Sequence, residues 1–189
     1  MKLKIPNILT IGRIILVPIF IGTFFLPGAM GDWIPFFIFL LASFTDFLDG
    51  LLARLFKEES KLGELLDPIA DKIIVASALV LLVMDDTIKD YEIIAALIIM
   101  VREILISGLR EFLAKVRVAM PVTNSAKFKT FIQMFAIGIL LTGESGNKII
   151  SLGEYNAHSI GIFFLWLAAF LTIYTGYDYV RRGIDHVID

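Results

Sequence analysis

The sequence contains no cysteine among its 189 residues and only two histidines. Missing thiols exclude a disulfide framework and a thiolate metal site, so a bound metal would need oxygen or imidazole ligands. Long lysine and arginine runs are also missing, and the formal net charge is −2. This balance excludes a strongly basic nucleic-acid-binding protein. Carboxylates are therefore the leading candidate metal ligands, and no nucleic-acid partner is expected.

Polar residues are scarce as well. Hydrophobic residues make up 58% of the chain, whereas soluble domains contain about 45 to 50% apolar residues. Lipid must therefore form part of the solvent around this protein. The first apolar run, which follows Lys2 and Lys4, could be a signal peptide, but Arg13 interrupts it and no small-residue cleavage site follows. We expect a retained first membrane span.

Six apolar segments approach the length of about 20 residues that a helix needs to cross the hydrocarbon core of a membrane. They are Ile8 to Leu26, Trp33 to Leu55, Pro68 to Met84, Ile93 to Leu113, Phe131 to Leu141 with polar extensions, and Ser159 to Val180. No internal repeat or long linker separates them. The sequence thus predicts an all-α integral membrane bundle of six transmembrane helices, with residues 1–189 forming a single membrane-embedded domain.

Six spans would bring both chain ends to one side of the membrane. Nearly all lysines and arginines fall on that side, and the opposite loops contain only Lys89 and Lys148. Because positively charged loops stay in the cytoplasm, this bias predicts cytoplasmic termini and a cytoplasmic 56–66 loop. We expect a multi-pass protein of a bacterial cytoplasmic (inner) membrane.

Acidic residues cluster between positions 46 and 71, beside the apolar runs. Two helical stripes carry them: Asp46, Asp49, Gly50 and Ala53 on the first, and Gly63, Asp67 and Asp71 on the second. Spacings of three and four residues place each set on one helix face. The short connection lets the two stripes face each other. Asp67 before Pro68 fits either a helix start or a kink within a longer helix.

Four converging carboxylates would repel one another, and either protonation or divalent cations would relieve that repulsion. Oxygen ligands suit Mg²⁺, Mn²⁺ or Ca²⁺. Two cations about 3.5 to 4 Å apart could clamp a phosphoryl group, and the small residues would let a bulky ligand approach. Two alternatives remain open from spacing alone: helix caps or solvated side chains at the membrane rim, and a proton or cation pathway of a carboxylate-lined transporter.

The complete pattern D-x2-D-G-x2-A-R-x8-G-x3-D-x3-D, from Asp46 to Asp71, resembles the signature of the CDP-alcohol phosphatidyltransferase family. The resemblance implies a six-helix membrane enzyme that displaces CMP from a CDP-linked lipid or alcohol with an incoming hydroxyl. It further implies two divalent cations, Mg²⁺ or Mn²⁺, and a homodimer. The implied metal ligands are Asp46, Asp49, Asp67 and Asp71. Asp71 would also be the catalytic general base, and Gly50, Ala53, Arg54 and Gly63 would line the CDP site.

Three further stretches, "IPNILTIGR", "VREILISGLREF" and "KFKTFIQM", resemble the family members that use glycerol 3-phosphate as acceptor. The resemblance implies transfer of a phosphatidyl group from CDP-diacylglycerol to glycerol 3-phosphate, with CMP as the second product. It places Asn7, Thr10 and Arg13 near the CDP end of the pocket. A helix N-cap at Asn7 with a snorkelling Arg13 is the alternative. Ala126 departs from the glycine expected before the first lysine of the third stretch.

Cations on the fourth and fifth segments suit an acceptor that carries a phosphate, because arginine pairs with phosphate through two hydrogen bonds. The candidates are Arg102, Arg110, Lys127 and Lys129, and Arg110 is the strongest. Arg102 lies deep in its span, where pairing with an acid such as Glu103 is expected. Lys127 and Lys129 could instead be interfacial anchors.

The sequence has no cysteine nucleophile and no serine–histidine pair within reach of the acidic stripes. A single displacement with inversion at phosphorus is therefore predicted. Two alternatives remain for the function. One is a related enzyme with another acceptor, such as phosphatidylglycerol in a cardiolipin synthase, and the other is the transporter described above.

Overall fold

The computed structural model describes the backbone of residues 5–56, 61–116, 118, 123–152 and 155–184. Within these ranges it describes the side chains from residue 11 onward, except at positions 47, 49–56, 61–65, 67, 68, 152 and 182–184.

Six long helices account for most of the described chain. They are α1 (Ile5–Thr23), α2 (Ala29–Phe56), α3 (Lys61–Met84), α4 (Glu92–Lys115), α5 (Asn124–Leu141) and α7 (Ala157–Ile184). Each overlaps one of the six apolar segments, so the all-α class is confirmed. The sequence did not predict the short helix α6 (Gly143–Ile149) or the antiparallel pair of β1 (Ser151–Leu152) and β2 (Tyr155–Asn156).

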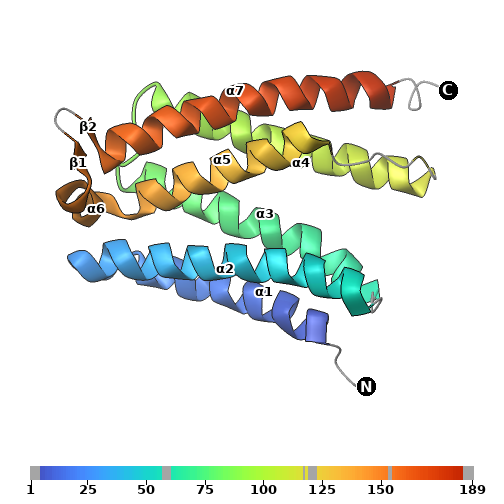
Figure 1. The fold of residues 1–189 in the computed structure, drawn as a ribbon, viewed down its shortest axis with the longest axis horizontal. Coiled ribbons are helices and arrows are strands. Elements are labelled where there is room, and N and C mark those ends of the chain that lie inside the picture. Colours follow the sequence, from blue (N-terminus) through green and yellow to red (C-terminus); the bar gives the residue numbers. More distant parts are fainter. Residues whose placement is uncertain (1–4, 57–60, 117, 119–122, 153–154, 185–189) are drawn as a thin grey trace.

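The long helices run back and forth along one bundle (Figure 1). The first turn of α1 and the last turn of α7 lie at the same end, which we call the terminal end, and α6 with the two short strands lies at the other. The N-terminal half consists of α1 packed against α2 and α3, and the C-terminal half consists of α7 packed against α5 and α4. Contacts of α3 with α4 and α5, and of α2 with α5, join the halves.

A continuous apolar core holds the halves together. Phe20, Leu79, Ile99, Ile137 and Leu165 come from five different helices, and all are completely buried. Burying side chains of this size stabilises the fold by about 1.5 to 3 kcal/mol each in water, although lipid reduces that advantage for a helix already in a membrane. The core thus fixes the helix positions from which the polar side chains project.

The turn between α1 and α2 explains why α1 ends at Thr23, before the expected limit at Leu26. Pro27 follows that limit, and a residue before proline avoids the helical region. Gly28 then adopts a φ of +62°, a left-handed conformation that glycine reaches without a steric penalty. The chain therefore reverses within a few residues.

The course of α3 excludes one of the two alternatives for Asp67 and Pro68, which were a helix start and a kink within a longer helix. The helix begins at Lys61 and continues through both residues to Met84. A helix start at Asp67 is therefore wrong, because the preceding residues already form helical turns. The acidic stripe of α3 consequently belongs to the first half of one long helix.

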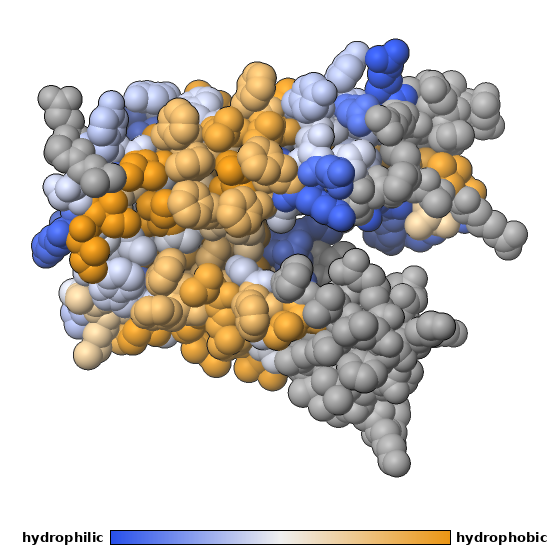
Figure 2. All heavy atoms as spheres, in the orientation of Figure 1, coloured by the Kyte–Doolittle hydropathy of each residue, from blue (hydrophilic) through white to orange (hydrophobic). Residues whose placement is uncertain are grey.

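The outer surface is strongly apolar. The side chains of Leu40, Phe44, Phe131 and Phe170 are all more than half exposed. Apolar residues cover the middle of the face seen in Figure 2, with hydrophilic residues toward its ends. Soluble monomers rarely expose such extensive apolar surface, which is typical of membrane contact.

By length and composition, two segments of the described chain could span a membrane, Ala29–Asp46 and Ala157–Arg181. The count of six spans stays a prediction.

Candidate active site

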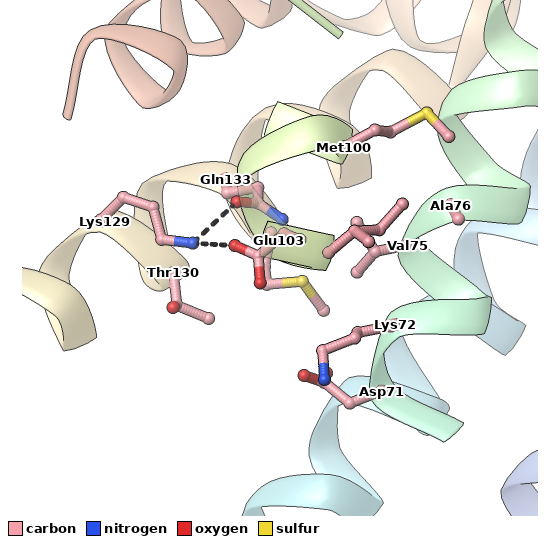
Figure 3. A pocket seen from close by; sticks show the side chains of 11 residues that line it. Asp71, Lys72, Val75, Ala76, Met100, Glu103, Lys129, Thr130 and Gln133 are labelled. Atoms are coloured by element: carbon pink, nitrogen blue, oxygen red, sulfur yellow. Dashed lines mark hydrogen bonds and ion pairs between the residues drawn. The ribbon is translucent and has the colours of Figure 1, made fainter. Parts of the chain in front are cut away.

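An open cavity lies between α3, α4 and α5. Its polar lining includes Asp71 and Lys72 from α3, Glu103 from α4, and Lys129 and Gln133 from α5. Figure 3 shows Asp71 and Lys72 on one side of the cavity, with Lys129, Gln133 and Glu103 grouped on another. Apolar side chains such as Val75 and Met100 complete the wall. The cavity therefore joins the acidic helix of the N-terminal half to the basic helices of the C-terminal half.

Among the described residues, Asp71 interacts with four other charged side chains. Its carboxylate interacts electrostatically with the negative charges of Asp46 and Glu103 and with the positive charges of Arg13 and Lys72. The predicted general base is thus partly buried and lies near a second predicted metal ligand, Asp46. Two carboxylates in this position repel each other unless a cation or a proton lies between them.

Arg13 orients the second of these carboxylates. Its Nη1 donates a hydrogen bond of 2.5 Å to Asp46 Oδ1, and the Arg13 side chain is only 1% exposed. A buried guanidinium does not reach water at the membrane surface, so the snorkelling alternative for Arg13 is wrong. Hydrogen bonds between ionised groups are short and strong. Such bonds commonly fix the orientation of metal-binding carboxylates.

The donor chemistry at this position fits Mg²⁺ or Mn²⁺, since Asp46 and Asp71 supply carboxylate oxygens from neighbouring helices. Asp49 follows Asp46 on α2 and Asp67 precedes Asp71 on α3, but their side chains lie outside the described part. The described side chains alone contain no group of three or more potential metal ligands. The remaining CDP-site predictions also fall on undescribed side chains: Asn7, Thr10, Gly50, Ala53, Arg54 and Gly63.

Lys129 supplies the positive charge on the cavity wall. The residue is only 2% exposed, and its ammonium donates hydrogen bonds to Glu103 Oε1 and to Gln133 Oε1, the latter at 3.1 Å. An interfacial anchor would extend toward water, so this alternative is wrong for Lys129. Lys127 is exposed, and both interpretations of Lys127 remain.

Arg102 turns away from the cavity toward α7. One terminal nitrogen donates to Glu103 Oε1 at 3.3 Å and the other to Thr175 Oγ1 at 3.2 Å. The guanidinium carbon also lies 5.9 Å from the centre of the Tyr179 ring. The expected pairing of Arg102 with Glu103 is confirmed. Arg110, the strongest acceptor candidate from the sequence, is exposed and does not line the cavity.

The sequence profile of one family, described as CDP-alcohol phosphatidyltransferase, matches residues 3–174. The chain belongs to the CDP-alcohol phosphatidyltransferase family.

Individual relatives align over nearly the full length of this CDP-alcohol phosphatidyltransferase. One from Rickettsia bellii is 45% identical, with 94% of each chain covered. Another from Haemophilus influenzae is 39% identical over 100% of this chain and 98% of the relative. A third from Cereibacter sphaeroides is 36% identical over 100% of this chain and 99% of the relative. All three are named "CDP-diacylglycerol--glycerol-3-phosphate 3-phosphatidyltransferase".

Among the cavity residues of this family member that were not predicted as site residues, Lys72, Glu103 and Gln133 form polar contacts there. Lys72 follows Asp71 directly, and its ammonium donates a hydrogen bond to the Ser107 hydroxyl on α4. Glu103 and Gln133 hold Lys129. The position of Lys72 beside an acidic signature residue was a usable signal. Glu103 and Gln133 lie in the stretches "VREILISGLREF" and "KFKTFIQM", but the sequence did not show that they hold Lys129, because that contact depends on the packing of α4 against α5.

Proposed function

We propose that this chain transfers a phosphatidyl group from CDP-diacylglycerol to the 1-hydroxyl of glycerol 3-phosphate, which gives phosphatidylglycerophosphate and CMP. The observation that carries the proposal is the shared cavity, where a carboxylate, Asp71, lies across from a buried ammonium, Lys129. A phosphorylated alcohol needs both groups, one for its hydroxyl proton and one for its phosphate. The names of the full-length relatives support the same reaction.

Asp71 is the proposed general base. It would accept the proton of the attacking hydroxyl, which must lie within about 3 Å of the carboxylate in a productive complex. Its partial burial and its position on the cavity wall support this role. Because no cysteine exists in the chain, the proposed reaction is a single displacement with inversion at phosphorus. A substrate with a chiral phosphorus that gave a product of retained configuration would contradict this scheme.

Two divalent cations, Mg²⁺ or Mn²⁺, complete the proposed site. Asp46, Asp49, Asp67 and Asp71 would hold them, and Arg13 would keep the Asp46 carboxylate in its orientation. When bound, such cations neutralise a diphosphate and its departing CMP. Crystals grown with manganese should give anomalous peaks between α2 and α3, and the lack of any peak there would contradict the ligand assignment.

The CDP group is proposed to bind beside these acids, along α1, α2 and the start of α3. Its proposed contacts are Asn7, Thr10, Arg13, Gly50, Ala53, Arg54 and Gly63. The Arg13–Asp46 bond supports this position, because it brings the predicted face of α1 against the acidic stripe of α2.

The acceptor phosphate is proposed to bind Lys129 in the cavity, with Arg102 supporting Lys129 through Glu103. Arg110 and Lys127 would act more weakly, as exposed charges on α4 and α5. A positive surface near a site raises the local concentration of an anionic substrate. Lys129 is therefore expected to contribute more to binding than either exposed residue.

The proposed setting is the cytoplasmic membrane of a bacterium, with six spans, a single domain over residues 1–189, cytoplasmic termini and a homodimeric assembly. The absence of cysteine allows a direct test of topology with single introduced thiols. In intact cells, an impermeant thiol reagent should label Lys148→Cys and spare Lys115→Cys. The reverse labelling would contradict the orientation.

Chemical crosslinking of the purified protein in detergent tests the dimer.

The deciding experiment measures CMP release from labelled CDP-diacylglycerol by the purified protein in detergent. Glycerol 3-phosphate with Mg²⁺ or Mn²⁺ should support release, and chelation of the metal should abolish it. Phosphatidylglycerol is the comparison acceptor. Faster reaction with phosphatidylglycerol would favour a cardiolipin synthase activity, and no release with any acceptor would favour the transporter alternative.

A further inference from the structure

Glu103 joins two cations from different helices at the edge of the cavity. Its Oε1 accepts hydrogen bonds from the Lys129 ammonium on α5 and from the Arg102 guanidinium on α4, the latter at 3.3 Å. The Glu103 side chain is 23% exposed and lines the cavity. Figure 3 shows its carboxylate directed toward Lys129 rather than across the cavity toward Asp71.

Lys129 depends on that carboxylate. The Lys129 side chain is 3% exposed, and an ammonium taken out of water is strongly unfavourable without an opposite charge. Its second partner, Gln133, is neutral and supplies only a carbonyl acceptor. Glu103 is therefore the group that compensates the buried charge at this position.

A competing carboxylate lies in the same cavity. Among the described residues that line it, the acids are Glu103 and Asp71. The flexible four-carbon stem of lysine allows its ammonium to change partners. If Glu103 lost its charge, the Lys129 ammonium would turn toward Asp71 or toward water. In either case the ammonium would leave its place on the cavity wall.

The support for Glu103 extends to the last helix. Arg102 is held by Thr175 on α7 at 3.2 Å and lies over the Tyr179 ring. Gly176 permits this packing, since an added Cβ would lie 3.2 Å from Arg102 Cγ. A continuous chain of contacts therefore runs from α7 through Arg102 and Glu103 to Lys129.

We propose that Glu103 is a positioning residue for acceptor recognition: anchored through Arg102 to α7, it holds the Lys129 ammonium on the α5 wall, where the phosphate of the acceptor binds. Glu103 itself touches no substrate atom in this scheme. The inference rests on the proposed transfer to glycerol 3-phosphate, and it assigns α7 a part in the site.

The test compares Michaelis constants in Glu103→Gln, which keeps the side-chain shape and removes the charge. The KM for glycerol 3-phosphate should rise about tenfold, the size expected for one charged hydrogen bond. The inhibition constant of inorganic phosphate, used as a competitor of the acceptor, should rise in parallel. The KM for CDP-diacylglycerol should stay within about twofold, because its proposed site lies in the N-terminal half.

A matched control lies on the same helix. Glu111 forms an exposed ion pair with Lys115 at 3.2 Å, and both side chains are 73% exposed. Glu111→Gln removes one negative charge from α4 and should leave both Michaelis constants unchanged. Glu103→Asp, which keeps the charge on a shorter side chain, should recover most of the affinity for glycerol 3-phosphate.

A double-mutant cycle separates positioning from general damage. In a Lys129→Ala background, Glu103→Gln should cause no further rise in the KM for glycerol 3-phosphate, because the residue that it positions is already gone. A full tenfold rise in that background would overturn the inference. If Glu103→Gln does not fold, Glu103→Ala in both backgrounds gives the same comparison, because it also removes the carboxylate.

The two proposals fail in distinguishable ways. If the unmodified protein releases CMP with glycerol 3-phosphate but Glu103→Gln leaves its KM unchanged, the positioning role is wrong and the function stands. If the unmodified protein shows no release with glycerol 3-phosphate, the function is wrong and the inference falls with it.

Discussion

The candidate site residues of the N-terminal half are mainly acidic and those of the C-terminal half mainly basic, and the two sets follow different patterns in the sequence. In the N-terminal half, Asp46 and Asp71 belong to short stripes whose spacing along the chain is regular. In the C-terminal half no such acidic stripe occurs, and contacts join distant positions: Lys129 and Glu103 are 26 residues apart, and Arg102 and Thr175 are 73 apart. Arg13 and Asp46 of the N-terminal half, 33 residues apart, are joined in the same way. Spacing along one helix predicts a stripe, but it does not predict which of two distant residues will meet. The cavity between α3, α4 and α5 contains residues of both sets.

The acidic half should show the largest single effect. Asp71→Asn removes the proposed base and a proposed metal ligand, and kcat should fall by at least about 10³-fold. CMP release with glycerol 3-phosphate measures the loss, and thermal unfolding in detergent checks that the fold survives. Unchanged release would remove Asp71 from the mechanism and with it the role assigned to the acidic half.

The basic half should respond in substrate affinity rather than in the chemical step. Lys129→Ala removes a buried cation from the cavity, and the KM for glycerol 3-phosphate should rise about 10- to 100-fold. Arg110→Ala removes an exposed cation and should raise the same constant less than about threefold, because solvent and salt screen exposed charges. Steady-state kinetics at fixed CDP-diacylglycerol measure both variants. A larger effect at Arg110 would restore the ranking that the sequence alone suggested.

Packing between α5 and α7 gives a prediction for stability. Gly161 faces Leu140, and an added Cβ would lie 2.7 Å from Leu140 Cδ2. Gly161→Ala should therefore destabilise the C-terminal half by about 1 to 3 kcal/mol through overpacking. Gly108 has no atom within 4 Å of an added Cβ, so Gly108→Ala should not destabilise the protein. Thermal unfolding of the two variants in detergent gives the comparison, and equal midpoints would contradict the close approach of α7.

The smallest effect is expected at the exposed end of α4. Lys115→Gln breaks the solvent-exposed pair with Glu111, and surface pairs contribute less than about 1 kcal/mol. Its unfolding midpoint and kinetic constants should match those of the unmodified protein. A clear loss of acceptor affinity would mean that charge anywhere on α4, rather than the buried Glu103 position, controls binding.

The helices of this protein could be predicted from the sequence with good accuracy. The apolar runs indicated all six long helices, although the third run began inside α3 and the fifth covered only the second part of α5. The short helix α6 and the strands after it were missed, since a few polar residues carry no periodic signal. The sequence also left Asp67 and Pro68 undecided, and α3 runs through both. An Asp-Pro pair looks the same in the sequence at a capped helix start and inside a longer helix, so the pair alone does not distinguish the two.

The sequence by itself determined the helix content, the two acidic stripes and the family, because these depend on spacing within single helices. The tertiary structure alone decided which cations reach the cavity. It buried Lys129 against Glu103, turned Arg102 to α7 and left Arg110 on the surface. The physical reason is that a helical pattern fixes which side chains share a face, whereas burial and charge pairing depend on the helix that this face meets.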